Sequence, residues 1–126
     1  MKVLAVGLGG FLGAISRYLL SGLAQSLFRN ATFPVGTLIV NVLGCLVIGV
    51  LSELAESRGM LSGFPRAFLF IGLLGGFTTF SAFGNETVLL VRDGQTLSAG
   101  ANILGNVVLG LAAVWVGRVA AHSIWR

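Results

Sequence analysis

The segment Gly72–Glu86, GLLGGFTTFSAFGNE, interrupts a stretch of sequence that is otherwise apolar enough to cross a membrane. Its first half combines three glycines with the pair Thr78–Thr79. Glycine lowers helix propensity by about 1 kcal/mol relative to alanine, and threonine is also a weak helix former. In hydrocarbon, an opened helix frees backbone groups that must face protein, an ion or a wet cavity. The segment therefore predicts a membrane helix broken at its centre, with the working site at the break.

The composition of the 126-residue chain is that of a membrane protein. Hydrophobic residues make up 56% and charged residues 10%, and the mean hydropathy is +0.97. A soluble domain carries about 25% charged residues. A hydrocarbon core needs about 20 apolar residues per helix, so four helices fill most of the chain. We therefore predict a single four-helix transmembrane domain over residues 1–126, without a soluble catalytic domain.

The apolar runs predict an all-α fold with four spans, at residues 3–27, 35–54, 66–91 and 97–120. Gly9 and Gly13 give the first span a GxxxG spacing, which lets helices approach closely. Glu53 and Glu56 are assigned to a solvated polar connection between the second and third spans. His122 is expected at the surface.

The basic residues hardly favour one orientation in the membrane. Four spans place both termini on one side, with five basic residues there and three, including Arg17, on the other. The positive-inside rule reads orientation from such an asymmetry, and this one is weak. Four short helices also enclose little space, so a pathway needs a second subunit. We therefore predict an antiparallel, dual-topology homodimer, with the lipid bilayer and a second copy of the chain as partners.

Enzymatic and nucleic-acid-binding functions find no support in the residues. One histidine and one cysteine provide no metal-ligand spacing, and Ser81 has no histidine or lysine base nearby. The glycines of residues 72–76 lack the GxxxxGK[ST] pattern of a phosphate loop. The basic residues are scattered rather than clustered, which argues against a nucleic-acid partner. We predict no catalytic residues and a protein that is not an enzyme.

An ion pathway accounts for the polar and aromatic residues around the predicted break. Phe80 and Phe83 are three residues apart and share a helix face, and the edge of a phenylalanine ring is positive enough to contact an anion. Asn41, Ser81 and Thr79 supply N–H and O–H donors. A small, strongly hydrated anion needs its water replaced by such donors. Ordinary packing of the two rings in a core is the alternative interpretation.

Two further features have an electrostatic interpretation. Freed carbonyls of Gly75 and Thr78 are hard oxygen ligands that suit Na⁺, and two from each subunit of a dimer form a cage of four. A cation there offsets the cost of bringing anions into a low dielectric. A water-filled break is the alternative. Arg17 is either an interfacial anchor or part of an electropositive mouth that concentrates anions.

Three segments carry a resemblance to a known family: GGFLGAISRY (Gly9–Tyr18), GTLIVNVLGC (Gly36–Cys45) and GLLGGFTTFSAF (Gly72–Phe83). They resemble the Fluc fluoride channels, also called CrcB proteins, and the likeness covers essentially the whole chain. It implies a fluoride-selective channel that passively exports fluoride from the cytoplasm and so lowers its toxicity. It also implies a multi-pass protein of the inner (plasma) membrane, an antiparallel homodimer with two pores, and a central structural Na⁺.

The resemblance also implies roles for individual residues. Asn41 is the pore amide, Phe80 and Phe83 flank the fluoride path, and Gly75 and Thr78 supply the carbonyls that bind Na⁺. The remaining implied pathway residues are polar: Ser81 and Glu86 along the third span, Asn102 and Asn106 in the fourth, and Arg17 at a vestibule.

The chain departs from the family pattern at a few positions. The family usually reads FSTF where this chain has Phe80-Ser81-Ala82-Phe83, so Ala82 lacks a hydroxyl. Asn102 and Asn106 align with positions that are often Tyr and Ser. Both asparagines are polar and lie one helical turn apart, so we expect them to face the pore.

A proton-coupled exporter similar to the small multidrug resistance transporters is the alternative function. Those proteins are also small four-span dimers, but they need a carboxylate in the first span. The first acidic residue here is Glu53, and Glu86 is the one candidate within a span. A structural membrane subunit without transport activity is a third class.

Overall fold

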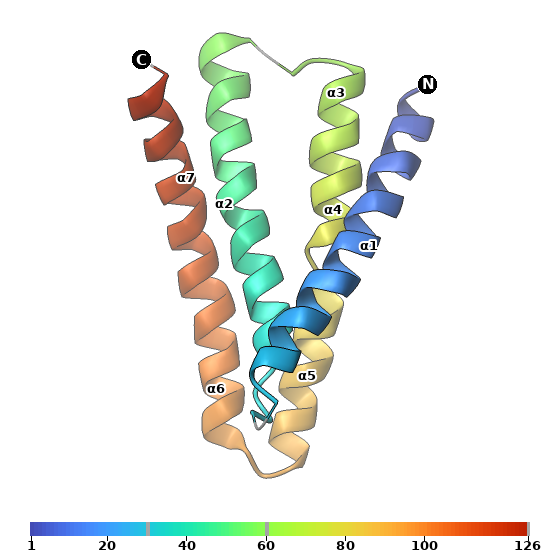
Figure 1. Ribbon diagram of the computed structural model, residues 1–126. Helices are drawn as coiled ribbons and strands as arrows, with labels where there is room; N and C mark the ends of the chain where they lie inside the picture. Colours follow the sequence, from blue (N-terminus) through green and yellow to red (C-terminus); the bar gives the residue numbers. More distant parts are fainter. Residues whose placement is uncertain (30, 60, 126) are drawn as a thin grey trace.

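All regular structure in the computed structural model, which describes residues 1–29, 31–59 and 61–125, is helical (Figure 1). In chain order the elements are α1 (Lys2–Leu27), α2 (Val35–Arg58), α3 (Phe64–Arg66), η1 (Ala67–Leu74), α4 (Gly75–Phe77), α5 (Phe80–Arg92), α6 (Thr96–Leu104), η2 (Gly105–Leu109) and α7 (Gly110–Ile124). They group into four segments long and apolar enough to cross a membrane: Lys2–Leu27, Val35–Arg58, Phe64–Arg92 and Thr96–Ile124. This confirms the predicted all-α fold with four spans.

The four spans run alternately up and down. Both termini and the connection between α2 and α3 lie at one end of the molecule, and the connections α1–α2 and α5–α6 lie at the other (Figure 1). α2 packs along α7, and α1 crosses the third span along η1 and α4. The third span therefore packs closely on α1 and makes only limited contact with α2, around η1, α4 and α5.

α2 is longer than its apolar run predicts. It continues to Arg58 and stops at Gly59, whose φ of 60° and ψ of 14° are left-handed. Glycine adopts this conformation without a steric penalty, so it commonly ends a helix. Glu53 and Glu56 therefore belong to α2, and their assignment to the connection between the spans was wrong.

The two glutamates join α2 to α7 through an ionic cluster. Arg118 Nη1 and Nη2 donate to the two carboxylate oxygens of Glu56 at 2.9 and 2.8 Å. Arg118 Nη1 also lies 3.7 Å from Glu53 Oε2, and His122 Nδ1 lies 3.0 Å from Glu53 Oε1. His122 is exposed as expected, but its contact with Glu53 makes it part of the fastening between the two helices.

Glycines let α1 and the third span approach at backbone distance. A Cβ on Gly9 would lie 2.8 Å from Leu73 N, and a Cβ on Gly76 would lie 2.7 Å from Gly10 O. Gly13, one turn after Gly9, faces the same span. Both distances are too short for a side chain, so larger residues would push the helices apart. A second seam of this kind lies between α2 and α7.

Most large apolar side chains point outward. The single chain exposes 7776 Å², whereas a soluble protein of its 13.1 kDa mass exposes about 6,400 Å². The fully buried apolar residues are mainly alanines and other small or medium side chains: Ala5, Ala24, Val40, Ala67, Leu74, Leu90, Ala99 and Ala121. The interior is thin, and the apolar exterior matches a hydrocarbon environment.

Candidate functional site

The third span changes its backbone conformation between α4 and α5. Thr78 has φ −86° and ψ 159°, and Thr79 has φ −149° and ψ 116°, both extended. Thr78 Oγ1 donates to Leu74 O at 2.9 Å, on the α4 side. Thr79 Oγ1 accepts from Ala82 N at 3.1 Å and so caps the first turn of α5. The two threonine hydroxyls therefore bind backbone groups on both sides of the extended pair, although Leu74 O also accepts from Thr78 N at 3.0 Å.

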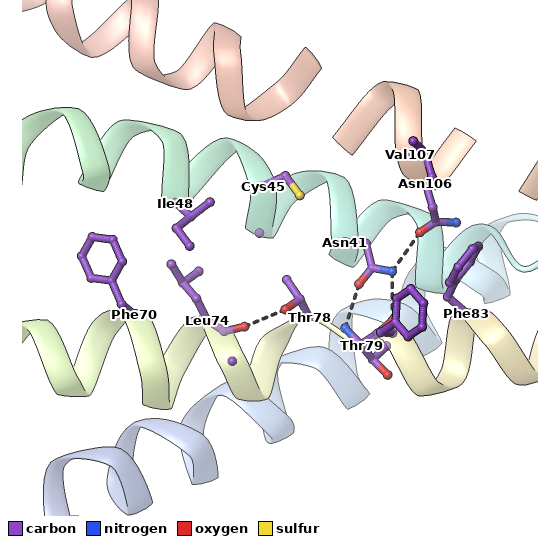
Figure 2. A pocket seen from close by; sticks show the side chains of 13 residues that line it. Asn41, Cys45, Ile48, Phe70, Leu74, Thr78, Thr79, Phe83, Asn106 and Val107 are labelled. Carbon is purple, nitrogen blue, oxygen red and sulfur yellow. Dashed lines mark hydrogen bonds between the residues drawn. The ribbon is translucent and has the colours of Figure 1, made fainter. Parts of the chain in front are cut away.

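Asn41, on α2, binds the backbone of Thr79 in both directions (Figure 2). Thr79 N donates to Asn41 Oδ1 at 2.8 Å, and Asn41 Nδ2 donates to Thr79 O at 3.1 Å. A buried backbone N–H or C=O without a partner is costly. One side-chain amide thus satisfies both polar groups of a residue that lies outside the helical hydrogen-bond ladder.

Asn41 also begins a chain of amide hydrogen bonds that reaches the fourth span. Its Nδ2 donates to Asn106 Oδ1 at 2.8 Å. Asn106 Nδ2 donates to Asn102 O at 3.0 Å and to Asn102 Oδ1 at 3.1 Å. Asn102, which is fully buried, donates from Nδ2 to Thr87 Oγ1 at 2.9 Å. The chain ties α2, the fourth span and α5 together.

Asn106 projects from a π-helical turn, η2. A π-helix has i→i+5 hydrogen bonds, is rare, and often occurs at functional sites. Gly105 opens η2, and Gly110 follows its end. Sequence reasoning missed η2 and also η1. The glycines that bracket η2 were the available signal, but glycine marks helix packing just as often.

A cavity of about 370 Å³ lies against this network (Figure 2). Its wall combines polar, aromatic and aliphatic residues: Asn41, Gly44, Cys45, Ile48, Phe70, Leu74, Gly75, Thr78, Thr79, Phe80, Phe83, Asn106 and Val107. The rings of Phe80 and Phe83 have centroids 5.4 Å apart and are tilted by 59°. Phe80 is 83% exposed in the single chain. The structure thus brings the predicted aromatic pair, the Asn41 amide and the two threonines to one cavity.

Four other candidates lie outside the cavity wall among the described residues: Asn102, described above, Ser81, Glu86 and Arg17. Ser81 is exposed, and its Oγ lies 3.4 Å from Thr79 Oγ1. Glu86 is partly buried and accepts from Thr37 Oγ1 at 2.7 Å; its Oε2 is buried without a hydrogen-bond partner in the described chain. Arg17, on α1, is partly buried.

Two threonines that sequence reasoning passed over take part in the polar network. Thr37 binds Glu86, and Thr87 receives the hydrogen bond from Asn102. Thr37 lies four residues before Asn41 and therefore on the same helix face, which is the signal that could have found it. Thr87 also donates to Phe83 O at 2.7 Å, a common use of a threonine inside a helix.

Carbonyls beside the extended pair lack their usual helical donors, Gly75 O and Thr78 O among them. In a continuous α-helix, the amide of Thr79 would bond to Gly75 O and the amide of Ala82 would bond to Thr78 O. Here these amides donate to Asn41 Oδ1 and Thr79 Oγ1. Among the described residues there is no group of three or more His, Cys, Asp and Glu side chains suited to a metal ion. Backbone carbonyl oxygens are therefore the candidate cation ligands at this site.

Comparison with known proteins decides the family. The family model described as "CrcB-like protein, Camphor Resistance (CrcB)" matches residues 4–118. The chain belongs to the CrcB family. This confirms the assignment that the three sequence segments indicated, and with the four spans it establishes a multi-pass membrane protein.

Several similar members of the CrcB family are named "Fluoride-specific ion channel FluC". The protein from Methylobacillus flagellatus is 47% identical over 92% of this chain and 91% of its own length. That from Opitutus terrae is 47% identical over 96% of this chain and 92% of its own. That from Solibacter usitatus is 46% identical over 97% of this chain and 99% of its own.

We predict that Asn41→Leu destabilises this CrcB family protein through Thr79. The substitution leaves the Thr79 N–H and C=O without partners, and each such buried group costs about 1–3 kcal/mol. The thermal midpoint of the purified protein in detergent should fall, and the Thr79 amide should exchange faster with deuterium. Asn106→Leu is the matched control, because it leaves both bonds between Asn41 and Thr79 in place. Equal losses in the two variants would contradict the prediction.

Proposed function

We propose that this CrcB family protein is a fluoride-selective channel of the inner membrane that lets fluoride leave the cytoplasm passively and so lowers its toxicity. The observation that carries the proposal is the 46–47% identity, over more than nine-tenths of both chains, to proteins named as fluoride-specific ion channels. This places the chain with channels rather than enzymes. The cavity beside Thr79 is where we look for the pathway.

The proposed pathway replaces the water of fluoride with fixed donors. The edges of Phe80 and Phe83 carry positive partial charge and border the cavity. Asn41 supplies N–H groups, and the hydroxyls of Thr79 and Ser81 lie 3.4 Å apart at the start of α5. No lysine or arginine is among the described residues that line the cavity. A moderate field of this kind binds an anion without trapping it.

The other proposed pathway residues extend the route towards the end of the molecule that carries the α1–α2 and α5–α6 connections (Figure 1). Glu86 is held by Thr37 on the third and second spans. Asn102 and Asn106 continue the polar line on the fourth span. Arg17 is proposed at a vestibule, where its charge concentrates anions before entry.

We propose an antiparallel, dual-topology homodimer as the working unit. Phe80 is 83% exposed and Gly75 is exposed in the single chain, although both border the cavity in the middle of a span. A second chain would enclose this wall. The weak charge bias of five basic residues against three permits both orientations in one membrane. If locking every subunit into one orientation with added terminal lysines left activity intact, the antiparallel arrangement would be wrong.

We propose that Na⁺ occupies the dimer axis, bound by Gly75 O and Thr78 O from both chains. The fit rests on the two carbonyls whose usual helical donors bond elsewhere. Such oxygens are hard ligands that suit Na⁺, and the extended conformation of Thr78 and Thr79 is what releases them. We interpret this conformation as the functional break of the third helix. A bound cation there supplies positive charge that lowers the cost of anions inside the membrane.

A proton-coupled exporter is the less favoured function. α1 contains no acidic residue, and such exporters need a carboxylate in the first span. The similar relatives are named as channels.

Fluoride efflux from liposomes tests the function directly. Liposomes that contain the purified protein and potassium fluoride are given a potassium ionophore, and a fluoride electrode follows release. We expect fast fluoride release, with parallel chloride release no faster than from protein-free liposomes. The rate should not change when a proton gradient is imposed. Coupling to the gradient would favour an exporter, and the absence of any fluoride flux would favour a structural subunit.

Replacing either ring of the aromatic pair should slow fluoride. Phe80→Ile and Phe83→Ile keep apolar bulk but remove the positive ring edge. A loss of about 1.4 kcal/mol at the slowest step corresponds to a tenfold lower rate, and we expect a decrease of at least about that size. Phe11→Ile is the control, because Phe11 is exposed on α1 and its ring should face lipid. Unchanged rates in both pathway variants, with normal dimers by size-exclusion chromatography, would remove the role of the rings.

Sodium removal should weaken the dimer. When Na⁺ is exchanged for a large organic cation, the fraction of dimer in dilute detergent and the rate of fluoride release should both decrease. Restoring Na⁺ should reverse the loss, because carbonyl oxygens need no chemical change to bind it again. A dimer fraction that stays constant across Na⁺, K⁺ and the organic cation would contradict the proposed cation site.

A further inference from the structure

Both hydrogens of the Asn41 side-chain amide are already engaged. A primary amide has two N–H donors. Asn41 Nδ2 donates to Thr79 O at 3.1 Å and to Asn106 Oδ1 at 2.8 Å. An anion that enters the cavity therefore finds no unengaged N–H on this amide. To bind Asn41, it has to take over one of these two hydrogen bonds.

The orientation of the Asn41 amide follows from the backbone. Thr79 N–H can only donate, so Asn41 Oδ1 faces it and Nδ2 faces Thr79 O and Asn106 Oδ1 (Figure 2). Asn106 in turn directs its Nδ2 at two oxygens of Asn102. Turning either amide over would set acceptor against acceptor. The network therefore has one consistent arrangement.

The two hydrogen bonds from Asn41 Nδ2 differ in what their loss leaves behind. Loss of the bond to Thr79 leaves a backbone carbonyl unpaired inside an apolar span, which is strongly unfavourable. Thr79 and Asn106 both border the cavity, but Thr79 is buried and Asn106 is half-buried. Loss of the bond to Asn106 therefore leaves a side-chain carbonyl that is better placed to meet water. The hydrogen that Asn106 holds is therefore the one that an anion can take.

We infer that Asn106 Oδ1 is an internal acceptor that fluoride must displace from Asn41, so Asn106 sets how tightly the pathway holds the anion. The inference rests on the proposed function. It makes Asn106 a positioning residue that acts through Asn41. A charged acceptor forms a stronger hydrogen bond than a neutral carbonyl, so fluoride wins the exchange. Its net gain is smaller than it would be at an open N–H, and the weaker hold favours fast release.

The test measures the rate of fluoride release against fluoride concentration for wild type, Asn106→Leu and Asn106→Ala. Both variants remove the competing carbonyl, while the bonds to Thr79 keep Asn41 aimed. One neutral hydrogen bond corresponds to about a fivefold change in an equilibrium constant. We expect the half-saturating concentration to fall about fivefold in both variants, with a lower maximal rate because fluoride leaves more slowly. Val108→Ala is the control, since Val108 is exposed on the same π-helical turn.

The outcomes separate this inference from the proposed function. If wild type releases no fluoride, the proposed function itself is wrong. If wild type conducts and both variants keep or raise the half-saturating concentration, Asn106 is not a competitor, and a rise indicates a direct ligand instead. A fall confined to one of the two folded variants points to side-chain volume and also overturns the inference. Asn106→Ala adds no bulk and supports the test if Asn106→Leu does not fold.

Discussion

An extended residue in the middle of an apolar span has to find partners for its own N–H and C=O, and a single amide on a neighbouring helix provides both for Thr79. Much of the arrangement around the cavity depends on this pair of hydrogen bonds. Because Asn41 sits on a regular helix, the pair fixes the height of α2 against the third span. It also fixes the direction of the remaining N–H of Asn41, and through it the position of Asn106.

The pair of bonds is possible only where the backbones come close, and the glycines make that approach. Gly44 lies three residues after Asn41 on the same face of α2, and a Cβ there would overlap the methyl group of Thr78. On the other side of the third span, Gly9 and Gly13 let α1 pack against the backbone of η1 and α4. A helix interrupted in hydrocarbon survives when protein surrounds it. The small residues on both neighbours provide part of this enclosure, on the sides of the third span that face α1 and α2.

The sequence predicted most of the fold and part of the site, for reasons that differ between them. Length and hydropathy are enough to find four spans, because each span must match the bilayer on its own. Their ends were less accurate, since charged residues such as Glu56 continue α2 until Gly59 stops it. The closeness of Phe80 and Phe83 followed from helical spacing, and the structure places their centroids 5.4 Å apart.

The contact of Asn41 with Thr79 joins residues 38 apart in the sequence, and no local pattern predicts a contact over such a separation. The π-helical turn at Asn106 was missed because the glycines that bracket it, Gly105 and Gly110, are equally typical of helix packing.

A polar network that already satisfies its own hydrogen bonds offers a physical basis for selectivity under the proposed function. The two amide hydrogens of Asn41 and those of Asn106 all have acceptors in the chain. An anion gains from Asn41 only the difference between its own hydrogen bond and the one it displaces. For a small, charge-dense acceptor such as fluoride, the new hydrogen bond is stronger than the displaced one, so the exchange is favourable. A larger halide spreads its charge over a greater radius and accepts a hydrogen bond more weakly. Its bond to Asn41 is then about as strong as the one it displaces, and the exchange does not offset the loss of its water. A network whose donors are all paired before an anion binds can therefore discriminate among anions better than a row of unpaired donors, which would attract any of them.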